Sequence, residues 1–136
     1  MHALIERGQE VSDLGAYSVD AVDYPDIASL LGRQVVTGEY DYGILICGTG
    51  VGMSIAVNKI KGIRAALCCH ALFAQLARRH NNANILCLAA MNDLHENLAC
   101  VDIFLKTDFE GGRHINRINK ITALDHQGCI NNVSDS

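Results

Sequence analysis

The residues best placed to do chemistry lie in the segment Ile46-Cys47-Gly48-Thr49-Gly50-Val51-Gly52-Met53. A short apolar run ends at Cys47, three glycines follow at alternate positions, and a helix-like stretch begins behind them. A glycine-rich turn at a helix N-terminus exposes backbone N–H groups and carries partial positive charge, so it favours a bound anion. The same field favours a thiolate over a thiol. The segment therefore predicts an anion site beside a reactive cysteine, with a plain tight turn beside an inert cysteine as the alternative.

A second group of polar side chains, His80 and Asn81, ends a helix-forming stretch. Histidine titrates near neutral pH and serves as a general acid or base, and asparagine can hold a sugar hydroxyl or an anionic oxygen. A plainer interpretation is that the helix dipole stabilises His80 and that Asn81 simply ends the helix. Local sequence leaves both interpretations open.

A third group, Arg113 and Arg117, lies four residues apart near the start of the last expected helix. Two guanidinium groups on one helix face suit a phosphate, and arginine is unfavourable for the dipole at a helix N-terminus unless an anion is bound. A solvated basic face is the alternative. The remaining histidines show no spacing that indicates a metal and are expected to be surface or packing residues: His70, His95, His114 and His126.

A thiolate, an imidazole and a phosphate clamp are together what a proton-transfer isomerisation of a sugar phosphate needs. A base removes the proton next to a carbonyl, and backbone N–H groups stabilise the enediolate oxygen. A second acid–base group opens the sugar ring, and the arginines hold the phosphate. The glycine spacing matches neither the dinucleotide fingerprint nor a P-loop, so nucleotide binding is not expected.

Composition limits the class of protein. The chain has 136 residues, of which 49% are hydrophobic, which predicts one folded domain with a real core. A net charge of −4 gives no reason to expect nucleic acid or a membrane as partner, and no apolar run approaches a membrane span. Residues 1–8 do not read as a signal peptide. The six cysteines lie mainly in apolar runs without a C-x-x-C pair, which indicates reduced thiols, a cytoplasmic location and no structural zinc.

The elements that must position these groups alternate along the chain. Continuous apolar runs predict strands over residues 44–47, 63–69 and 84–89, and helical patterns cover residues 25–38, 71–80, 94–106 and 114–125. A helix behind the glycine turn is expected to run to Lys59, and residues 1–7 and 10–14 predict a helix end and a short strand. Such alternation predicts an α/β fold with a parallel sheet covered on both faces and ligands beyond the carboxyl ends of its strands. We expect one domain over residues 1–125 and a polar tail over 126–136, frayed from Gln127.

Several motifs closely resemble those of type B ribose-5-phosphate isomerases, in a wider ribose/galactose isomerase family that includes the galactose-6-phosphate isomerase subunits. The resemblance covers nearly the whole chain to about Leu124 and rests on motifs in the family's order: Asp23-Tyr24-Pro25, Ile46-Cys47-Gly48-Thr49-Gly50-Val51-Gly52, Asn58-Lys59, Gly62-Ile63-Arg64-Ala65, Arg79-His80-Asn81 and Glu110-Gly111-Gly112-Arg113-His114 with Arg117.

The resemblance implies a Rossmann-like αβα sandwich with a five-stranded parallel sheet, and a homodimer or dimer of dimers with active sites at the subunit interface. It implies no metal and no organic cofactor. Cys47 would be the base that moves the proton between C1 and C2, and His80 would open the furanose ring. Thr49 would hold the enediolate together with the rest of its turn, Gly48, Gly50, Val51 and Gly52. Asn81 would contact substrate, and Arg113 and Arg117 would bind the phosphate.

Two features depart from the family pattern. The family's first strand, central in its sheet and ending in Gly-Cys-Asp-His, has no counterpart here, so the chain is expected to lack it. Met91 stands where many ribose-5-phosphate enzymes carry an arginine, which weakens the phosphate clamp or indicates another sugar phosphate such as galactose 6-phosphate. A non-catalytic or degenerate sugar-phosphate-binding subunit is therefore the main alternative to an isomerase. A Cys–His hydrolase is a third and weaker one.

Overall fold

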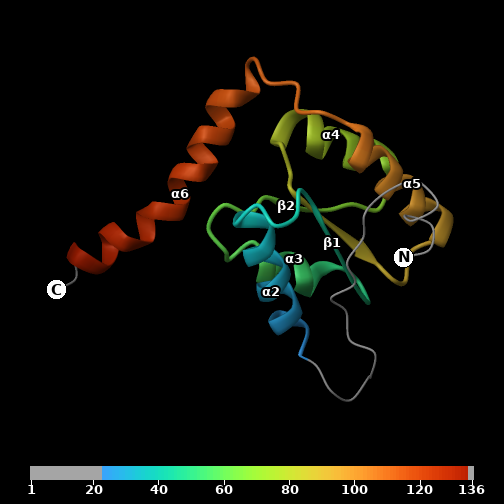
Figure 1. Cartoon of the computed structure of the whole chain (residues 1–136), viewed down its shortest axis with the longest axis horizontal. Helices are drawn as coiled ribbons and strands as arrows, with labels where there is room; N and C mark the ends of the chain where they lie inside the picture. Colours follow the sequence, from blue (N-terminus) through green and yellow to red (C-terminus); the bar gives the residue numbers. More distant parts are fainter. Residues whose placement is uncertain (1–22, 135–136) are drawn as a thin grey trace.

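The structure, a computed structural model, describes residues 23–134, and for residues 128–134 it describes the backbone alone. Helices and strands alternate along the described chain (Figure 1). Their order is α2 (Tyr24–Val36), β1 (Gly43–Cys47), α3 (Val51–Val57), β2 (Ala65–Leu67), α4 (Ala71–Asn81), β3 (Ile85–Ala89), α5 (Leu94–Lys106) and α6 (His114–Ser134). The elements expected over residues 1–7 and 10–14, and the expectation about the family's first strand, concern a part of the chain outside the described residues.

The three described strands form a parallel sheet in the order β1-β3-β2. Gly43 pairs with Ile85 and Cys47 with Ala89, so β1 and β3 run side by side over their full lengths. All five residues of β3 are buried, which explains why this strand reads as a continuous apolar run. The expected α/β class with a parallel sheet is confirmed.

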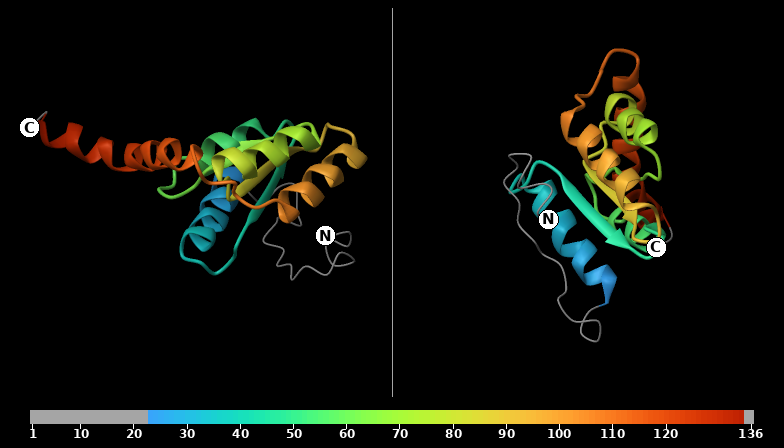
Figure 2. Two further views of the ribbon diagram at one scale, coloured as in Figure 1. Left: turned by 90° about the horizontal axis from the view of Figure 1, so that it is seen from above. Right: turned by 90° about the vertical axis from the view of Figure 1, so that its right-hand side faces the viewer.

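Helices cover both faces of the sheet (Figure 2). Alternate residues of β3 point to opposite sides, so Leu86 and Leu88 join one core and Ile85 and Cys87 the other. The first core includes Phe104 of α5 and residues of α4. The second core is closed by α2 and α3. This layering is the αβα sandwich that the family resemblance implies.

Some expected element boundaries are wrong. The second strand covers only residues 65–67, and α3 ends at Val57, where Asn58 caps it, rather than at Lys59. The tail expected to fray from Gln127 continues instead as α6 to Ser134, because no proline interrupts its backbone hydrogen bonds. Figures 1 and 2 show α6 projecting away from the body of the molecule. None of the described helices is both long and apolar enough to cross a membrane.

Candidate active site

The glycine turn after β1 lies against the ends of the other two strands. Gly50 has a φ of 79°, which favours glycine. A Cβ at this position would lie 2.5 Å from the Leu67 side chain and 3.0 Å from the Leu88 backbone carbonyl. The turn is also tied to the chain after β3, since the Ala90 N–H donates to the Cys47 carbonyl at 2.8 Å. Only glycine therefore allows this turn to pass so close to the sheet.

The turn presents backbone donors beside a half-buried thiol. The N–H of Val51 donates to the Thr49 hydroxyl at 3.2 Å. The N–H groups of Gly48, Thr49 and Gly50 donate to no acceptor within residues 23–134. Cys47, immediately before them, is partly accessible. Three such donors can stabilise an oxyanion that forms when a neighbouring thiolate takes a proton from the carbon next to a carbonyl.

The end of α4 places His80 in a second cluster. The His80 ring stacks on the His114 ring, with centroids 4.3 Å apart and an interplanar angle of 17°. Its Nε2 lies 3.9 Å from Oε2 of Glu110, and the same oxygen accepts a hydrogen bond from Arg79 Nη2 at 3.1 Å. The Glu110 N–H donates to the Arg79 carbonyl at 3.0 Å. These contacts attach the loop before α6 to the end of α4 and hold the two imidazoles together.

His114 is the functional candidate that sequence reasoning left among the surface and packing residues. It does pack, being 4% exposed, but its partner is the predicted acid–base group His80. Burial, with the nearby His80 and Arg113, lowers the pKa of His114 from its ordinary value of 6.5. The signal available in the sequence was its position directly after Arg113 in one motif.

Acidification is expected to destabilise the folded chain through His114. Because its folded-state pKa is lowered, the unfolded chain binds more protons, so the stability contribution is complete above about pH 6.5 and falls as pH drops toward the lowered value. Replacing His114 with phenylalanine keeps a stacking ring and removes the titration. Urea unfolding at about pH 7.5 and about pH 5.5 should show a smaller loss in His114→Phe than in the wild type. His95→Gln, at an exposed histidine, is the matched control. If acidification lowered the unfolding free energy of His114→Phe as much as that of the wild type, His114 would not be the group responsible.

Arg113 and Arg117 lie on the exposed surface beside this histidine pair. α6 begins at His114, so Arg113 immediately precedes the helix and Arg117 lies one turn inside it. Nε of Arg113 is 3.5 Å from Nε2 of His114, and neither arginine forms an ion pair with a described carboxylate. Both guanidinium groups are therefore available to an anion such as a phosphate.

The same cluster contains three potential metal ligands. Ligand atoms of His80, Glu110 and His114 all lie within 4.8 Å of one another, a donor set that zinc accepts. However, Arg79 already pairs with Glu110, and Arg113 lies beside His114. Positive charge this close opposes a cation and favours an anion. The cluster therefore suits an anionic ligand better than a metal ion.

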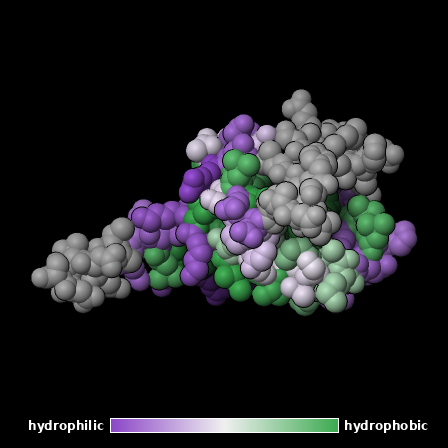
Figure 3. All heavy atoms as spheres, turned by 90° about the horizontal axis from the view of Figure 1, so that it is seen from below, coloured by the Kyte–Doolittle hydropathy of each residue, from purple (hydrophilic) through white to green (hydrophobic). Residues whose placement is uncertain are grey.

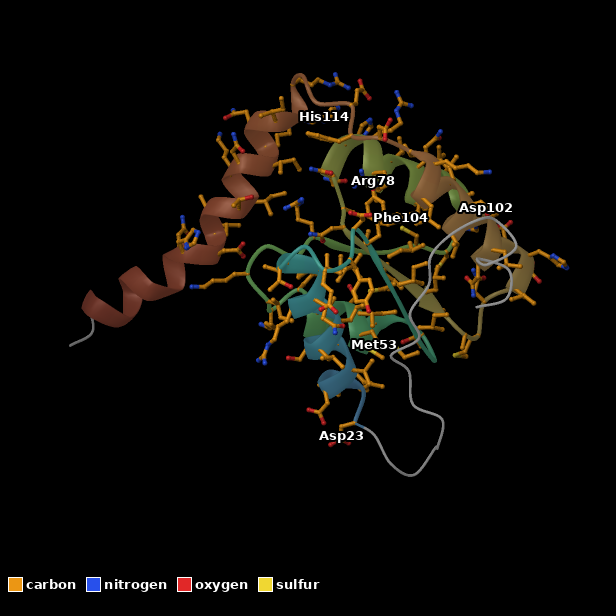
Figure 4. All side chains as sticks on the ribbon, viewed as in Figure 1. Asp23, Met53, Arg78, Asp102, Phe104 and His114 are labelled. Carbon is orange, nitrogen blue, oxygen red and sulfur yellow. The ribbon has the colours of Figure 1, made fainter. Side chains whose placement is uncertain are left out.

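The structure places the two groups at opposite edges of the sheet. Cys47 ends β1 next to Ala89, the last residue of β3, whereas His80 and Asn81 come just before β3 begins at Ile85. The length of β3 between these edges is roughly 13 Å. Figure 4 shows His114 at one end of the molecule, far from Met53 in the helix that follows the glycine turn. Within one chain, then, Cys47 and His80 are not brought together.

A pocket of about 290 Å³ opens at the edge where His80 lies, between the start of β2, the end of α4 and α6. Asn81 lines it, together with Asn58, Ile63, Arg64, Ala65, Ala66, Ala83 and Ile121. Met91, in contrast, is 80% exposed at the other edge, where its N–H donates to the Gly48 carbonyl at 3.1 Å. The family departure at Met91 therefore lies beside the thiol.

Fold and site together define an α/β protein with a candidate thiol and a candidate histidine at the two opposite edges of one parallel sheet. The model of the Ribose/Galactose Isomerase family matches residues 1–121, and the chain belongs to this family. It is 47% identical over 125 residues to ribose-5-phosphate isomerase B of Escherichia coli, covering 91% of this chain and 84% of that one.

Solved structures agree with this membership. Ribose-5-phosphate isomerase B of Clostridium thermocellum matches with a TM-score of 0.88 and 46% identity over 91% of this chain and 84% of that one. The enzyme of Mycoplasma genitalium, solved with bound ribulose 5-phosphate, matches with a TM-score of 0.86 and 48% identity over the same shares, 91% and 84%. The expected family and its Rossmann-like fold are thus confirmed.

Proposed function

We propose that this chain interconverts ribose 5-phosphate and ribulose 5-phosphate through an enediolate. The observation that carries the proposal is the half-buried Cys47 thiol beside three backbone N–H groups without a described acceptor. Similarity to relatives named ribose-5-phosphate isomerase B, one of them solved with ribulose 5-phosphate, supports the choice of substrate. Because Met91, which replaces an arginine found in many of these enzymes, lies beside the thiol, galactose 6-phosphate is the alternative substrate to test.

In the proposed reaction His80 opens the furanose ring: it gives a proton to the ring oxygen and accepts the C1 hydroxyl proton, so that the bond between C1 and the ring oxygen breaks and the C1 aldehyde forms. The Cys47 thiolate then takes the C2 proton of the open aldose, and the electron pair moves onto the carbonyl oxygen at C1. The N–H groups of Gly48, Thr49 and Gly50 stabilise that charge. The C2 hydroxyl proton then passes to O1, and C1 takes the proton back from Cys47 as the C2 carbonyl forms.

The remaining predicted residues hold the substrate. The glycine turn through Val51 and Gly52 encloses the sugar, Asn81 contacts a hydroxyl, and Arg113 with Arg117 binds the phosphate. Every step of the proposed reaction is a proton transfer, either to a protein side chain or between neighbouring substrate oxygens, so the reaction requires neither a metal nor an organic cofactor. The free thiols of the five described cysteines are compatible with a cytoplasmic location.

The division of the site supports a homodimer. Because Cys47 and His80 lie at opposite edges of one sheet, we propose that a second copy brings its histidine edge to the first copy's thiol edge. A two-fold axis would then complete two equivalent sites, and a dimer of dimers could repeat the arrangement. The projecting α6 supports this, because Ile115, Ile121 and Leu124 are 50%, 42% and 59% exposed. Figure 3 shows apolar side chains on the body beside the mostly hydrophilic projection of α6.

The test is proton NMR of ribose 5-phosphate in D2O with the purified chain. The expected result is loss of the C2 proton signal and appearance of ribulose 5-phosphate. A folded chain that is stabilised thermally by the sugar phosphate but gives no exchange would overturn the proposal in favour of a non-catalytic binding subunit. Faster turnover of galactose 6-phosphate in the same assay would show that the chain has the substrate preference of the galactose-6-phosphate branch of the family.

A further inference from the structure

We propose that Arg64 is a positioning residue of the active site, whose guanidinium fixes the turn that presents His80 and Asn81. This inference rests on the proposed role of His80. Arg64 lies directly before β2, on a different element from the turn it contacts. Its Nε lies 3.2 Å from the Asn81 carbonyl and 3.1 Å from the Asn82 carbonyl, and its Nη2 donates to the latter at 2.9 Å.

The turn needs such a partner because it is short and irregular. The last carbonyls of a helix have no partner within the helix, and here α4 must give way to β3 within a few residues. Asn82 adopts a left-handed conformation, with a φ of 47°. Arg64 supplies donors to this exposed backbone directly after His80. Among the described residues no other group donates to the carbonyls of Asn81 and Asn82, so without Arg64 they would be left to water.

Arg64 is itself held rigidly against the turn. Its backbone N–H donates to Asn84 Oδ1 at 2.8 Å, and its carbonyl accepts from the Asn84 N–H at 2.9 Å. Asn84 Nδ2 in turn donates to the Gly62 carbonyl at 2.9 Å. The guanidinium therefore acts from a fixed base, which is what positioning requires.

The same segment also reaches α6. The Gly62 N–H donates to Oδ2 of Asp125 at 2.9 Å, so residues 62–64 connect α6 to the turn after α4. α6 carries Arg117, and the end of α4, directly before the turn, carries the predicted ring-opening group. The segment thus sets the spacing between the proposed phosphate-binding and ring-opening side chains. Arg64 and Asn81 both line the pocket that lies between these elements.

Another arginine, Arg78, supports the same turn from inside the protein. Comparing it with Arg64 distinguishes a residue that stabilises the fold from one that positions the site. Arg78 is 5% exposed, packs on Tyr42 and Phe104, and donates to the Ala83 carbonyl at 2.6 Å. Removing it would damage the core. Arg64 is only partly buried and acts on the carbonyls next to His80, so its loss should disturb the site more than the fold.

The chemistry offers a readout that a general structural defect would not produce. Ribose 5-phosphate is mainly cyclic and must be opened, whereas ribulose 5-phosphate stays open-chain because its O5 carries the phosphate. Exchange of the C1 proton of ribulose 5-phosphate in D2O needs Cys47 but no ring opening. At saturating substrate, loss of Arg64 should therefore slow ribose 5-phosphate turnover and leave the rate of that exchange unchanged, because a weakened Asn81 contact would change KM for both sugar phosphates.

The experiment compares Arg64→Met with Arg33→Met, in which an exposed arginine of α2 is removed in the same way. For Arg64→Met we expect kcat for ribose 5-phosphate to fall about 10- to 100-fold, with wild-type C1 exchange from ribulose 5-phosphate. Arg64→Lys, which offers one donor group in place of the planar fork, should give an intermediate kcat. A parallel fall of both rates, or no fall in kcat, would overturn the proposal.

Hydrogen–deuterium exchange separates this proposal from the proposed function. If the wild type turns over no ribose 5-phosphate, the proposed function fails whatever Arg64 does. The order of the turn is then measured directly by amide exchange. Arg64→Met should speed exchange at the amides of residues 82–84 and leave exchange at the interior amides of β3 unchanged. Unaltered exchange at residues 82–84 would overturn the positioning role by itself.

Discussion

Replacing Cys47 with serine should reduce proton exchange at C2 of ribose 5-phosphate by about 10³-fold while leaving sugar-phosphate binding close to wild type. A thiol can supply a thiolate base near neutral pH, whereas an alcohol of nearly the same size cannot. The donors of Gly48, Thr49 and Gly50 belong to the backbone, so the substitution leaves them in place. Proton NMR in D2O measures the exchange, and titration calorimetry measures the binding.

Cys69→Ser is the matched control for this experiment. Cys69 is an exposed cysteine beyond the carboxyl end of β2, and its backbone carbonyl accepts a hydrogen bond from Asn92 Nδ2 at 3.1 Å. It should keep wild-type exchange. If Cys47→Ser lost binding together with exchange, or kept its exchange, Cys47 would not be the base.

Two inactive variants should restore one another when they share a dimer. Cys47→Ser lacks the base and His80→Asn lacks the ring-opening group, so each alone should be inactive on ribose 5-phosphate. If each site takes Cys47 from one chain and His80 from the other, a mixed dimer has one site with both defects and one with none. Random assortment of equal amounts should then recover about a quarter of wild-type activity.

The same mixture distinguishes a site built within one chain. In that case every site of the mixed dimer would carry one defect, and no activity would return. Each variant, unfolded and refolded alone through the same cycle, provides the background rate. Size-exclusion chromatography with light scattering shows whether the refolded material is dimeric, and activity in a monomeric fraction would argue against a shared site.

The sequence by itself determined most of the helices and strands and the glycine turn that follows Cys47. Apolar runs at residues 44–47 and 84–89 predicted β1 and β3, because a strand buried on both faces admits few polar residues. The glycine pattern after Cys47 predicted the turn, and Gly50 does take the left-handed conformation that the pattern requires. These features are local, so composition and periodicity within a few residues are enough to indicate them.

Only the tertiary structure decided how the separate motifs meet. It placed His80 and Cys47 at opposite edges of the sheet, stacked His80 on His114, and directed Arg64 to the carbonyls of Asn81 and Asn82. It also continued α6 to Ser134, past the expected frayed tail. The physical reason is that parallel strands joined by helices fix the edge at which each loop emerges, whereas contacts between loops far apart in the chain leave no periodic trace in the sequence.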